Sequence, residues 1–405
     1  MNSAINVLWE HPKYGKFVFA LFWIFLILEG CTEPFSPEIP ASEGLLVVDA
    51  TITNELKNHQ IFLSRSTQGE PEPLAESNAM VRIVDDNQQQ FTFMEISPGT
   101  YESSIMFAAE PNRSYRLLIT TSSGREYAST PLLLPQVTEI EDIYIERTTS
   151  QSGLNGVGIF VNSFDSTGNS IYYKYEYEET YRVIAPRWFP QELVITSENP
   201  LIVEEVGRVG QRVCYATQKS NNLILTNTSG VGEDRISDFN VRFLSNNNYI
   251  ISHRYSILVK QFVLSRQVFE FYEKLQDFSG SESLFSESQP GFIVGNIAPQ
   301  DGGNDQVVGI FDVSSVSEKR VFFNYSDFFP DEDLPPFAED CPFKTRFAPE
   351  FGELASLIRQ NLISFNSENE DRNPFANEGP WDVQPRVCGD CTALGTETIP
   401  DFWEE

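Results

Sequence analysis

The sequence is poor in histidine, cysteine and basic residues. Its 405 residues include 3 His, 5 Cys and 28 Lys plus Arg, against 58 Asp plus Glu, which gives a net charge of −30. A surface this acidic repels phosphate backbones, so nucleic acid is excluded as a partner and direct adhesion to anionic lipid is disfavoured. With 40% hydrophobic and 13% aromatic residues the chain can still bury a core, and disorder is not expected.

The sequence lacks the residue motifs of the common hydrolase active sites. No Gly-x-Ser-x-Gly motif occurs, and His59 and His253 are the histidines left once an N-terminal leader is removed. Arg386 is the one cation near Cys388 that could lower the pKa of a nucleophilic thiol, and Asp390 lies beside it. We therefore expect no catalytic residue, no cofactor and no enzymatic activity.

What the sequence does contain begins with an export signal. Lys13 and Lys16 precede an unbroken apolar run over residues 17–28, and Gly30 precedes Cys31. The run is too short to span a bilayer comfortably and has the pattern of a secretory signal. The cysteine after a small residue resembles a bacterial lipoprotein signal, so residues 1–30 are predicted to be cleaved and Cys31 to carry lipid. The alternative is an uncleaved anchor helix, and either version tethers the chain to a membrane.

Short apolar runs separated by Gly, Asn and Asp predict a mainly β chain. After a proline-containing tether over 31–43, residues 44–135 have the strand spacing of an immunoglobulin or transthyretin-like β-sandwich, similar to the regulatory domains of carboxypeptidases. Residues 136–325 predict a larger β-rich domain with a helix near 265–278. Residues 326–405 are acidic, loop-rich and cysteine-containing, with a second short helix at 353–362, and are expected to pack on that domain.

Residues 171–181 alternate with the period of a strand. The two faces are Tyr173, Tyr175 and Tyr177 on one side, and Lys174, Glu176 and Glu178 on the other. Two glutamates about 7 Å apart along a strand could serve glycoside hydrolysis, but a solvated face screened by Lys174 is the preferred interpretation. The acidic groups at 301–305 and 331–333 do not follow the twelve-residue calcium-loop pattern, so no metal is assigned.

Four cysteines remain once Cys31 is assigned to lipid. An even number in an exported chain favours disulfides among Cys214, Cys341, Cys388 and Cys391, with three possible connectivities. Free thiols, or a zinc half-site at Cys388 and Cys391, are the alternatives. We favour a bond from Cys341 to Cys388 or Cys391, because a loop-rich segment needs covalent help to stay in place.

The scarce tryptophans are the candidates for binding. Trp188 follows Arg187 in a segment bracketed by Pro186 and Pro190, the composition of an anchor in a protein interface or of a platform for sugar. Trp381 is a second candidate. The alternative is that these rings fold onto their own domain. Phe402 and Trp403, close to the chain end, are expected to dock into a groove of the body.

Several segments together carry a family resemblance. They are, in chain order, Cys31–Phe35, Leu46–Ile52, Tyr172–Thr180, Arg254–Gln261, Gly295–Ile297, Cys388–Cys391 and Pro400–Trp403. In these segments the chain resembles the Bacteroidota lipoproteins classed as domain of unknown function four-two-four-nine. The resemblance implies an outer-membrane lipoprotein whose gene neighbours encode TonB-dependent receptors with a carboxypeptidase-like plug extension. It attaches no activity and transfers no site residue. Glu33 is similar to the acidic signals that direct such lipoproteins to the cell surface.

Two functional hypotheses follow. The first is a surface-exposed, lipid-anchored accessory of a TonB-dependent transporter, which captures ligand for the receptor. The second is a stand-alone surface module that binds glycan or peptide through Trp188 or Trp381.

Overall fold

The computed structural model describes residues 44–67, 73–280, 293, 295–303, 306–341, 345–346, 351–371, 373, 375 and 379–405. The predicted leader at 1–30, the lipidated Cys31 and the tether at 31–43 lie outside these ranges. Residues 45–405 form one compact unit. Over the described ranges, no helix has both the length and the apolar character needed to cross a bilayer.

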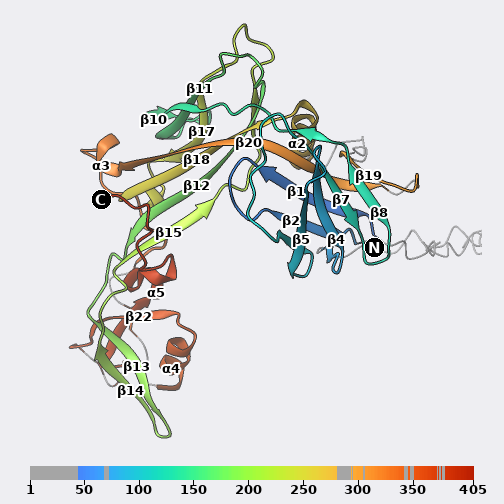
Figure 1. Cartoon of the computed structure of the whole chain (residues 1–405). Helices are drawn as coiled ribbons and strands as arrows, with labels where there is room; N and C mark the ends of the chain where they lie inside the picture. Colours follow the sequence, from blue (N-terminus) through green and yellow to red (C-terminus); the bar gives the residue numbers. More distant parts are fainter. Residues whose placement is uncertain are drawn as a thin grey trace, which may run out of the picture. The chain divides into compact units, whose positions relative to one another are not determined.

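The described chain is mainly β, as its short apolar runs predict (Figure 1). In β1, Val48, Ala50 and Ile52 are buried and alternate with more accessible residues, the period of a strand with one face on a core. The strands of the segment predicted as a sandwich are β1 (Leu46–Thr53), β2 (Gln60–Arg65), β3 (Leu74–Ala75), β4 (Met80–Asp85), β5 (Gln90–Ser97), β6 (Thr100–Ser103), β7 (Ser114–Thr120), β8 (Glu126–Ser129) and β9 (Leu132–Leu133).

The next segment contains longer strands and the predicted helix. Its elements are β10 (Ile140–Thr149), β11 (Asn155–Phe164), β12 (Tyr172–Ile184), β13 (Gln191–Glu198), β14 (Leu201–Gly207), β15 (Val213–Lys219), β16 (Ile224–Asn227), β17 (Arg235–Ser245), η1 (Tyr249–Ile251), β18 (Arg254–Leu264), α2 (Arg266–Gly280), β19 (Ile297–Pro299) and β20 (Val307–Asn324). At the start of α2 the Ser265 hydroxyl accepts a hydrogen bond from the Val268 amide at 3.4 Å, which caps the first turn.

The C-terminal segment contains short elements joined by loops, as expected. They are α3 (Tyr325–Phe328), β21 (Thr345–Arg346), α4 (Phe351–Arg359), β22 (Ile363–Glu368), β23 (Trp381–Pro385), α5 (Arg386–Gly389) and η3 (Cys391–Ala393). Helix α4 corresponds to the second helix predicted at 353–362.

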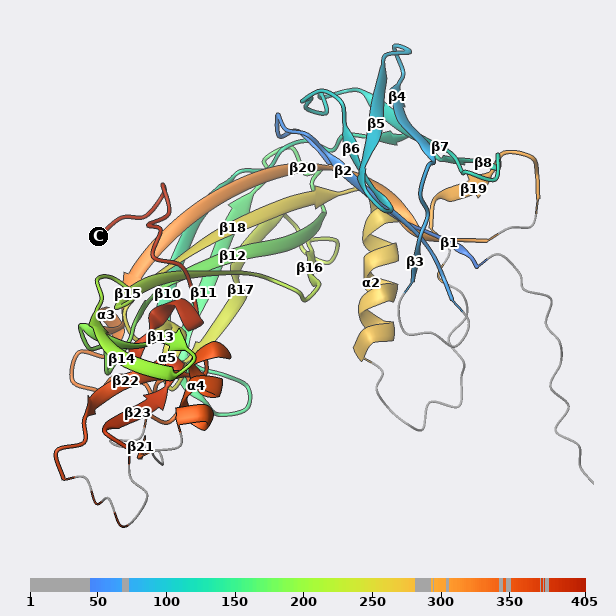
Figure 2. The ribbon, with the colours of Figure 1, turned by 90° about the horizontal axis from the view of Figure 1, so that it is seen from below.

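Strand β20 joins the two β regions (Figure 2). Its first part pairs in parallel with β1, from Val307 opposite Leu46 to Ser314 opposite Thr53, and its second part pairs antiparallel with β18. Gly309 makes the parallel approach possible: its φ is +107°, and a Cβ there would lie 1.8 Å from the Val48 carbonyl oxygen. The boundary predicted at 135 remains a prediction, but the strands on its two sides share one sheet.

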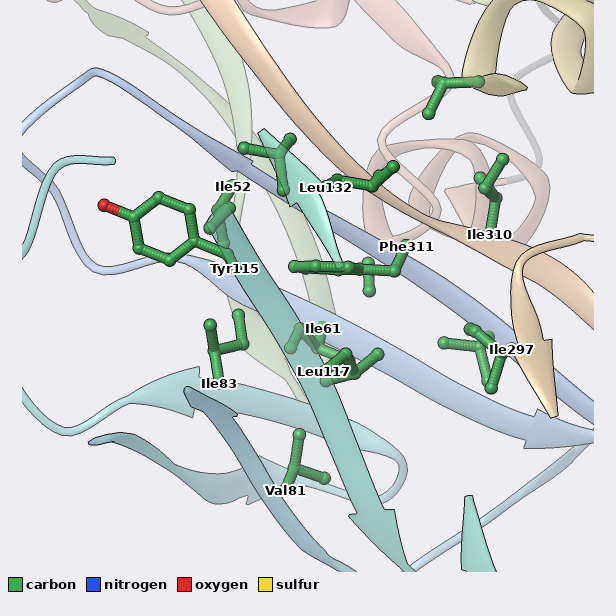
Figure 3. Close-up of a cluster of buried hydrophobic side chains, with 14 of the residues drawn as sticks. Ile52, Ile61, Val81, Ile83, Tyr115, Leu117, Leu132, Ile297, Ile310 and Phe311 are labelled. Carbon is green, nitrogen blue, oxygen red and sulfur yellow. The ribbon is translucent and has the colours of Figure 1, made fainter. Parts of the chain in front are cut away.

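The first core reflects this joining. Figure 3 shows Ile52, Ile83 and Leu117 of the early strands beside Phe311 of β20. Helix α2 contributes Val268 and other apolar residues to the same cluster. The stripe predicted along the helix therefore packs inward, against a core that begins more than 200 residues earlier in the chain.

The second core is rich in tyrosine. Tyr173, Tyr175 and Tyr177 are all buried there, so the predicted alternation of β12 is confirmed. Buried hydroxyls need partners, and Tyr173 donates to Asp234 at 3.0 Å while Tyr175 donates to Gln261 at 2.9 Å.

Two disulfides hold the C-terminal segment in place. Cys341 bonds Cys388, one of its two favoured partners, and Cys391 bonds Cys214 at the start of β15. The free-thiol and zinc interpretations of these four residues are therefore wrong. The chain end docks as expected: the Trp403 ring centroid lies 4.9 Å from that of Tyr215, and the Arg320 guanidinium lies 3.5 Å from the centre of the Phe402 ring.

Replacing Cys341 and Cys388 together by serine should lower the free energy of unfolding by about 4 kcal/mol, because it opens a 47-residue loop in the unfolded chain. The matching Cys214 and Cys391 variant should lose at least as much, since its loop spans 177 residues. Urea unfolding of the full chain in non-ionic detergent measures both, with the reduced wild type as control. An unchanged midpoint would contradict the prediction.

Candidate functional site

The predicted anchor Trp188 lies between β12 and β13 and is partly buried. Its Nε1 donates to the Gly210 carbonyl at 2.6 Å, and the Arg208 guanidinium lies 5.9 Å from the centre of its ring. The neighbouring Arg187 amide donates to the Cys388 carbonyl at 2.9 Å. The segment is thus tied to the disulfide-bonded C-terminal part, and the ring keeps one side accessible.

This side of Trp188 faces a groove, here called the Trp188 groove. Its volume is about 660 Å³, and its lining residues are Pro186, Arg187, Trp188, Phe189, Asn366, Ser367, Glu368, Glu370 and Asp371. Aromatic rings and carboxylates therefore meet across residues that lie some 180 positions apart in the sequence. Such a lining suits a polar ligand that also offers a flat apolar face.

Trp381 does not line this groove. It stands opposite Glu368 in the ladder of β22 and β23 and packs against the third core, which includes Leu193, Leu354 and Phe365. Of the two candidate tryptophans, the structure places Trp188 on a groove and Trp381 against its own domain.

A larger cavity lies where β1, β12, β18 and β20 meet α2. Its volume is about 730 Å³. We call it the Lys174 cavity, and its lining residues include Asp49, Thr51, Phe62, Lys174, Glu176, Leu223, Phe262, Phe271, Tyr272, Leu275, Val308 and Ile310.

Lys174 corrects the expectation of a solvated face on β12. The residue is only 6% exposed. Its Nζ lies 3.0 Å from Glu176 Oε1 and 4.6 and 4.9 Å from the ring centres of Phe262 and Tyr272. The physical reason is α2, which brings Tyr272 over this face of the sheet. Glu176, whose side chain is 47% exposed, does face solvent as expected.

Two further carboxylates come from the joined strands β1 and β20. Asp312 is fully buried, and its Oδ1 accepts a hydrogen bond from the Ser314 hydroxyl. Its Oδ2 has no partner among the described residues. Asp49 is open to the cavity and experiences the charges of Lys174 and Glu176.

The electrostatics follow from these positions. Burial raises the pKa of Asp312 to about 6, and Glu176 and Asp49 add to that effect while Lys174 opposes it. Desolvation also raises the pKa of Asp49. Burial alone would lower the pKa of Lys174, but Tyr272, Glu176 and Asp312 outweigh it and raise that pKa, so the ammonium stays charged. Three carboxylates thus surround one cation, and negative charge is in excess.

Comparison with known families now identifies the chain. The model described as "Domain of unknown function (DUF4249)" matches residues 32–320. The chain belongs to the DUF4249 family. The match contains every residue named above for the Lys174 cavity, whereas residues 366–371 of the Trp188 groove lie beyond it.

Other comparisons add little about this DUF4249 chain. Among curated proteins there is no significant match. A crystal structure of a DUF4785 family protein from Legionella pneumophila is 7% identical, covers 53% of this chain and 51% of that protein, and has a TM-score of 0.17. The chain thus spans about half the length of that protein, and a TM-score this low supports no argument about fold.

Neither histidine considered as a catalytic base is well suited to that role. His59 is buried, its Nε2 lies 3.0 Å from the Phe107 carbonyl oxygen, and burial lowers its pKa to about 4. Burial also lowers the pKa of His253. Within the described ranges, no three His, Cys, Asp or Glu side chains are grouped to hold a metal ion. The candidate calcium ligands Asn304 and Asp305 lie outside those ranges.

Sequence reasoning missed the Lys174 cavity, although one signal was available. The apolar stripe predicted along 265–278 needs a sheet face to cover, and the face of β12 opposite its tyrosines is the one that it partly covers. Asp312 could not be found this way, because its position depends on the parallel pairing of β20 with β1.

The Asp312→Asn variant should gain stability relative to wild type as pH rises. The folded wild type holds the Asp312 proton up to a pKa of about 6, whereas the unfolded carboxyl has a pKa of 3.8. Between these values the folded state binds more protons, so this residue makes wild-type stability fall with rising pH. The variant has no such proton, and its amide oxygen can still accept from Ser314.

Between about pH 4 and about pH 8, the unfolding free energy of the variant should therefore rise by about 3 kcal/mol relative to that of the wild type. The matched control is Asp277→Asn, which removes a carboxylate from the exposed side of α2, outside the cavity lining. Parallel pH profiles for Asp312→Asn and wild type would show that the Asp312 pKa is ordinary.

Proposed function

We propose that this DUF4249 chain is a non-catalytic outer-membrane lipoprotein, exposed on the cell surface, that captures ligand as the accessory partner of a TonB-dependent transporter. The observation that carries the proposal is the Lys174 cavity. Its volume of about 730 Å³ lies in the range of small-molecule sites, and it combines apolar walls with a few converging charged groups.

The chemistry of this lining favours binding over reaction. Its one imidazole is His59, which already contacts the Phe107 carbonyl. Its two lysines are both paired, Lys174 with Glu176 and Lys57 with Glu55. The described lining therefore offers no pair of nucleophile and base of the kind used in covalent catalysis. It does offer charge and shape, which are what a capture site needs.

The membrane part of the proposal is supported by the sequence. An acyl chain on Cys31 would contribute about 0.8 kcal/mol per buried methylene, which an acidic body needs because it cannot bind anionic lipid by charge. The proline-containing tether at 31–43 would hold the body clear of the lipid and leave the cavity open to a neighbouring receptor.

A tagged full-length chain should copurify with a β-barrel receptor from outer membranes solubilised in mild detergent. Mass spectrometry of the eluate identifies the partner, and an unrelated tagged lipoprotein measures background. The Cys31→Ser variant, which lacks the thiol that accepts lipid, should leave the membrane fraction. Recovery of the wild-type chain without any barrel protein would refute the partnership.

A second function is favoured by a different observation. The Trp188 groove has a volume of about 660 Å³ and places an indole beside Glu368, Glu370 and Asp371. Stacking on a ring with hydrogen bonds to carboxylates is a common way to hold sugar or peptide. A stand-alone surface module for glycan or peptide is therefore the alternative proposal.

If that alternative holds, Trp188→Ala should weaken binding at least about ten-fold to any glycan or peptide that the full chain selects on an array. Trp381→Ala is the matched control, since Trp381 lies outside the groove lining and its loss should leave binding unchanged. Melting curves of both variants report whether the fold persists. Equal binding by wild type and a folded Trp188→Ala variant would exclude the groove.

A further inference from the structure

An acceptor that no described residue satisfies lies beneath the lining of the Lys174 cavity. Asp312 is fully buried, and its Oδ2 has no hydrogen-bond partner among the described residues although its Oδ1 accepts from Ser314. A buried carboxylate oxygen without a donor is costly, and the cost is removed when a donor or a cation reaches it.

The strand register directs this acceptor toward the cavity. Asp312 stands opposite Thr51 in the parallel pairing of β20 with β1, and partners in such a pair point to the same face. Thr51 lines the cavity, and so does Ile310, two residues before Asp312 on the same strand. The charge of the Asp312 carboxylate also helps to raise the pKa of Lys174.

The remaining charges favour a cation over an anion at this position. Lys174 already pairs with Glu176 at 3.0 Å, and Lys57, the other lysine of the lining, pairs with Glu55. Asp49 and Asp312 form no ion pair within 4 Å among the described residues, and the charge of Lys174 offsets theirs only in part. An anionic ligand drawn to Lys174 would meet three carboxylates, whereas a cationic group would relieve their mutual repulsion.

The walls of the cavity would suit an apolar body attached to that cation. Phe62 is 46% exposed and Leu275 is 38% exposed, although both are large apolar residues at the cavity. Phe262, Phe271 and Ile310 continue the same surface more deeply. Covering such side chains is favourable in proportion to the apolar area removed from water.

We propose that the Lys174 cavity binds a molecule with a primary ammonium or guanidinium group on an apolar body. The cation would sit against Asp49 and Glu176 in the cavity lining, attracted also by the charge of Asp312 beneath them, and the apolar part would cover Phe62 and Leu275. This inference rests on the ligand-capture role proposed above and adds the chemical class of the ligand.

Binding should weaken in acid. The titratable groups that face Asp312 are Asp49 from β1, Lys174 and Glu176 from β12, and Tyr272 from α2. Protonation of Asp312, whose pKa is raised to about 6, removes a buried charge that attracts the ligand, while an alkylammonium remains charged. Affinity should therefore be lower at about pH 5 than at about pH 8.

Three probes of equal length test the class: hexylammonium, hexanol and hexanoate. Titration calorimetry and ligand-induced shifts in melting temperature are measured on the full chain in non-ionic detergent at millimolar probe concentration. Hexylammonium should bind more tightly than hexanol at about pH 8, and hexanoate should not bind. Asp312→Asn should reduce hexylammonium affinity at least about ten-fold, while Asp277→Asn should leave it unchanged.

Because Asp312 is buried, the variant Asp49→Asn at an exposed position provides a second test. The expected loss of hexylammonium affinity is smaller for this variant. Preference for hexanoate, equal binding of all three probes, or no binding of hexylammonium would overturn the inference. The inference would also be overturned if Asp312→Asn and Asp49→Asn both bound hexylammonium with wild-type affinity. The receptor pull-down is independent of these titrations, so a recovered barrel partner with a failed titration would reject the ligand class alone.

Discussion

The parallel pairing of β1 with β20 is the contact on which the rest of the molecule depends. It joins strands that lie about 260 residues apart in the sequence, and it aligns Leu46–Thr53 with Val307–Ser314. Closing so long a loop costs conformational entropy, which grows slowly with length and must be offset by burial. Phe311 and Val313 of β20, both fully buried, supply part of that burial inside the first core.

The same pairing creates the charged cluster. It brings Asp312 beside Thr51 and Asp49, and antiparallel pairing through β18 then places Lys174 of β12 within reach. Burying this carboxylate costs free energy, which the Ser314 hydroxyl and the charge of Lys174 offset only in part. Buried polar groups whose hydrogen-bonding capacity is only partly satisfied occur often at functional sites.

The sequence was sufficient to predict those parts of the structure that depend on the local pattern of apolar and polar residues. The alternation of residues 171–181 predicted which tyrosines enter the second core, and the apolar stripe predicted α2. Composition and the loop-rich C-terminal segment led to a bond from Cys341 to Cys388 or Cys391, and the structure has the bond to Cys388. The second pair, Cys214 with Cys391, could not be chosen from spacing, because it depends on the position of η3 beside β15.

Where structure is set by distant segments, local pattern misled. Lys174 has the alternation of a solvent-facing residue, and it is buried because α2, some 95 positions later, folds over it. Trp188 and Trp381 were both candidates for binding from the sequence, yet Trp188 lines a groove and Trp381 packs on the third core. Burial of a charged or aromatic residue is a property of its three-dimensional neighbours, and a single sequence does not specify which distant neighbours those are.

The charge of the whole chain and the charge of the Lys174 cavity act in the same direction. With 58 acidic and 28 basic residues, the surface field raises the local concentration of cations. That field is screened over about 8 Å at physiological ionic strength, so it brings a ligand near the protein without selecting where it binds. Selection needs a desolvated carboxylate beside apolar walls, and the join of β1, β20 and α2 provides one. An acidic ligand would be disfavoured at both stages, by the surface at long range and by Asp49 and Glu176 in the cavity lining.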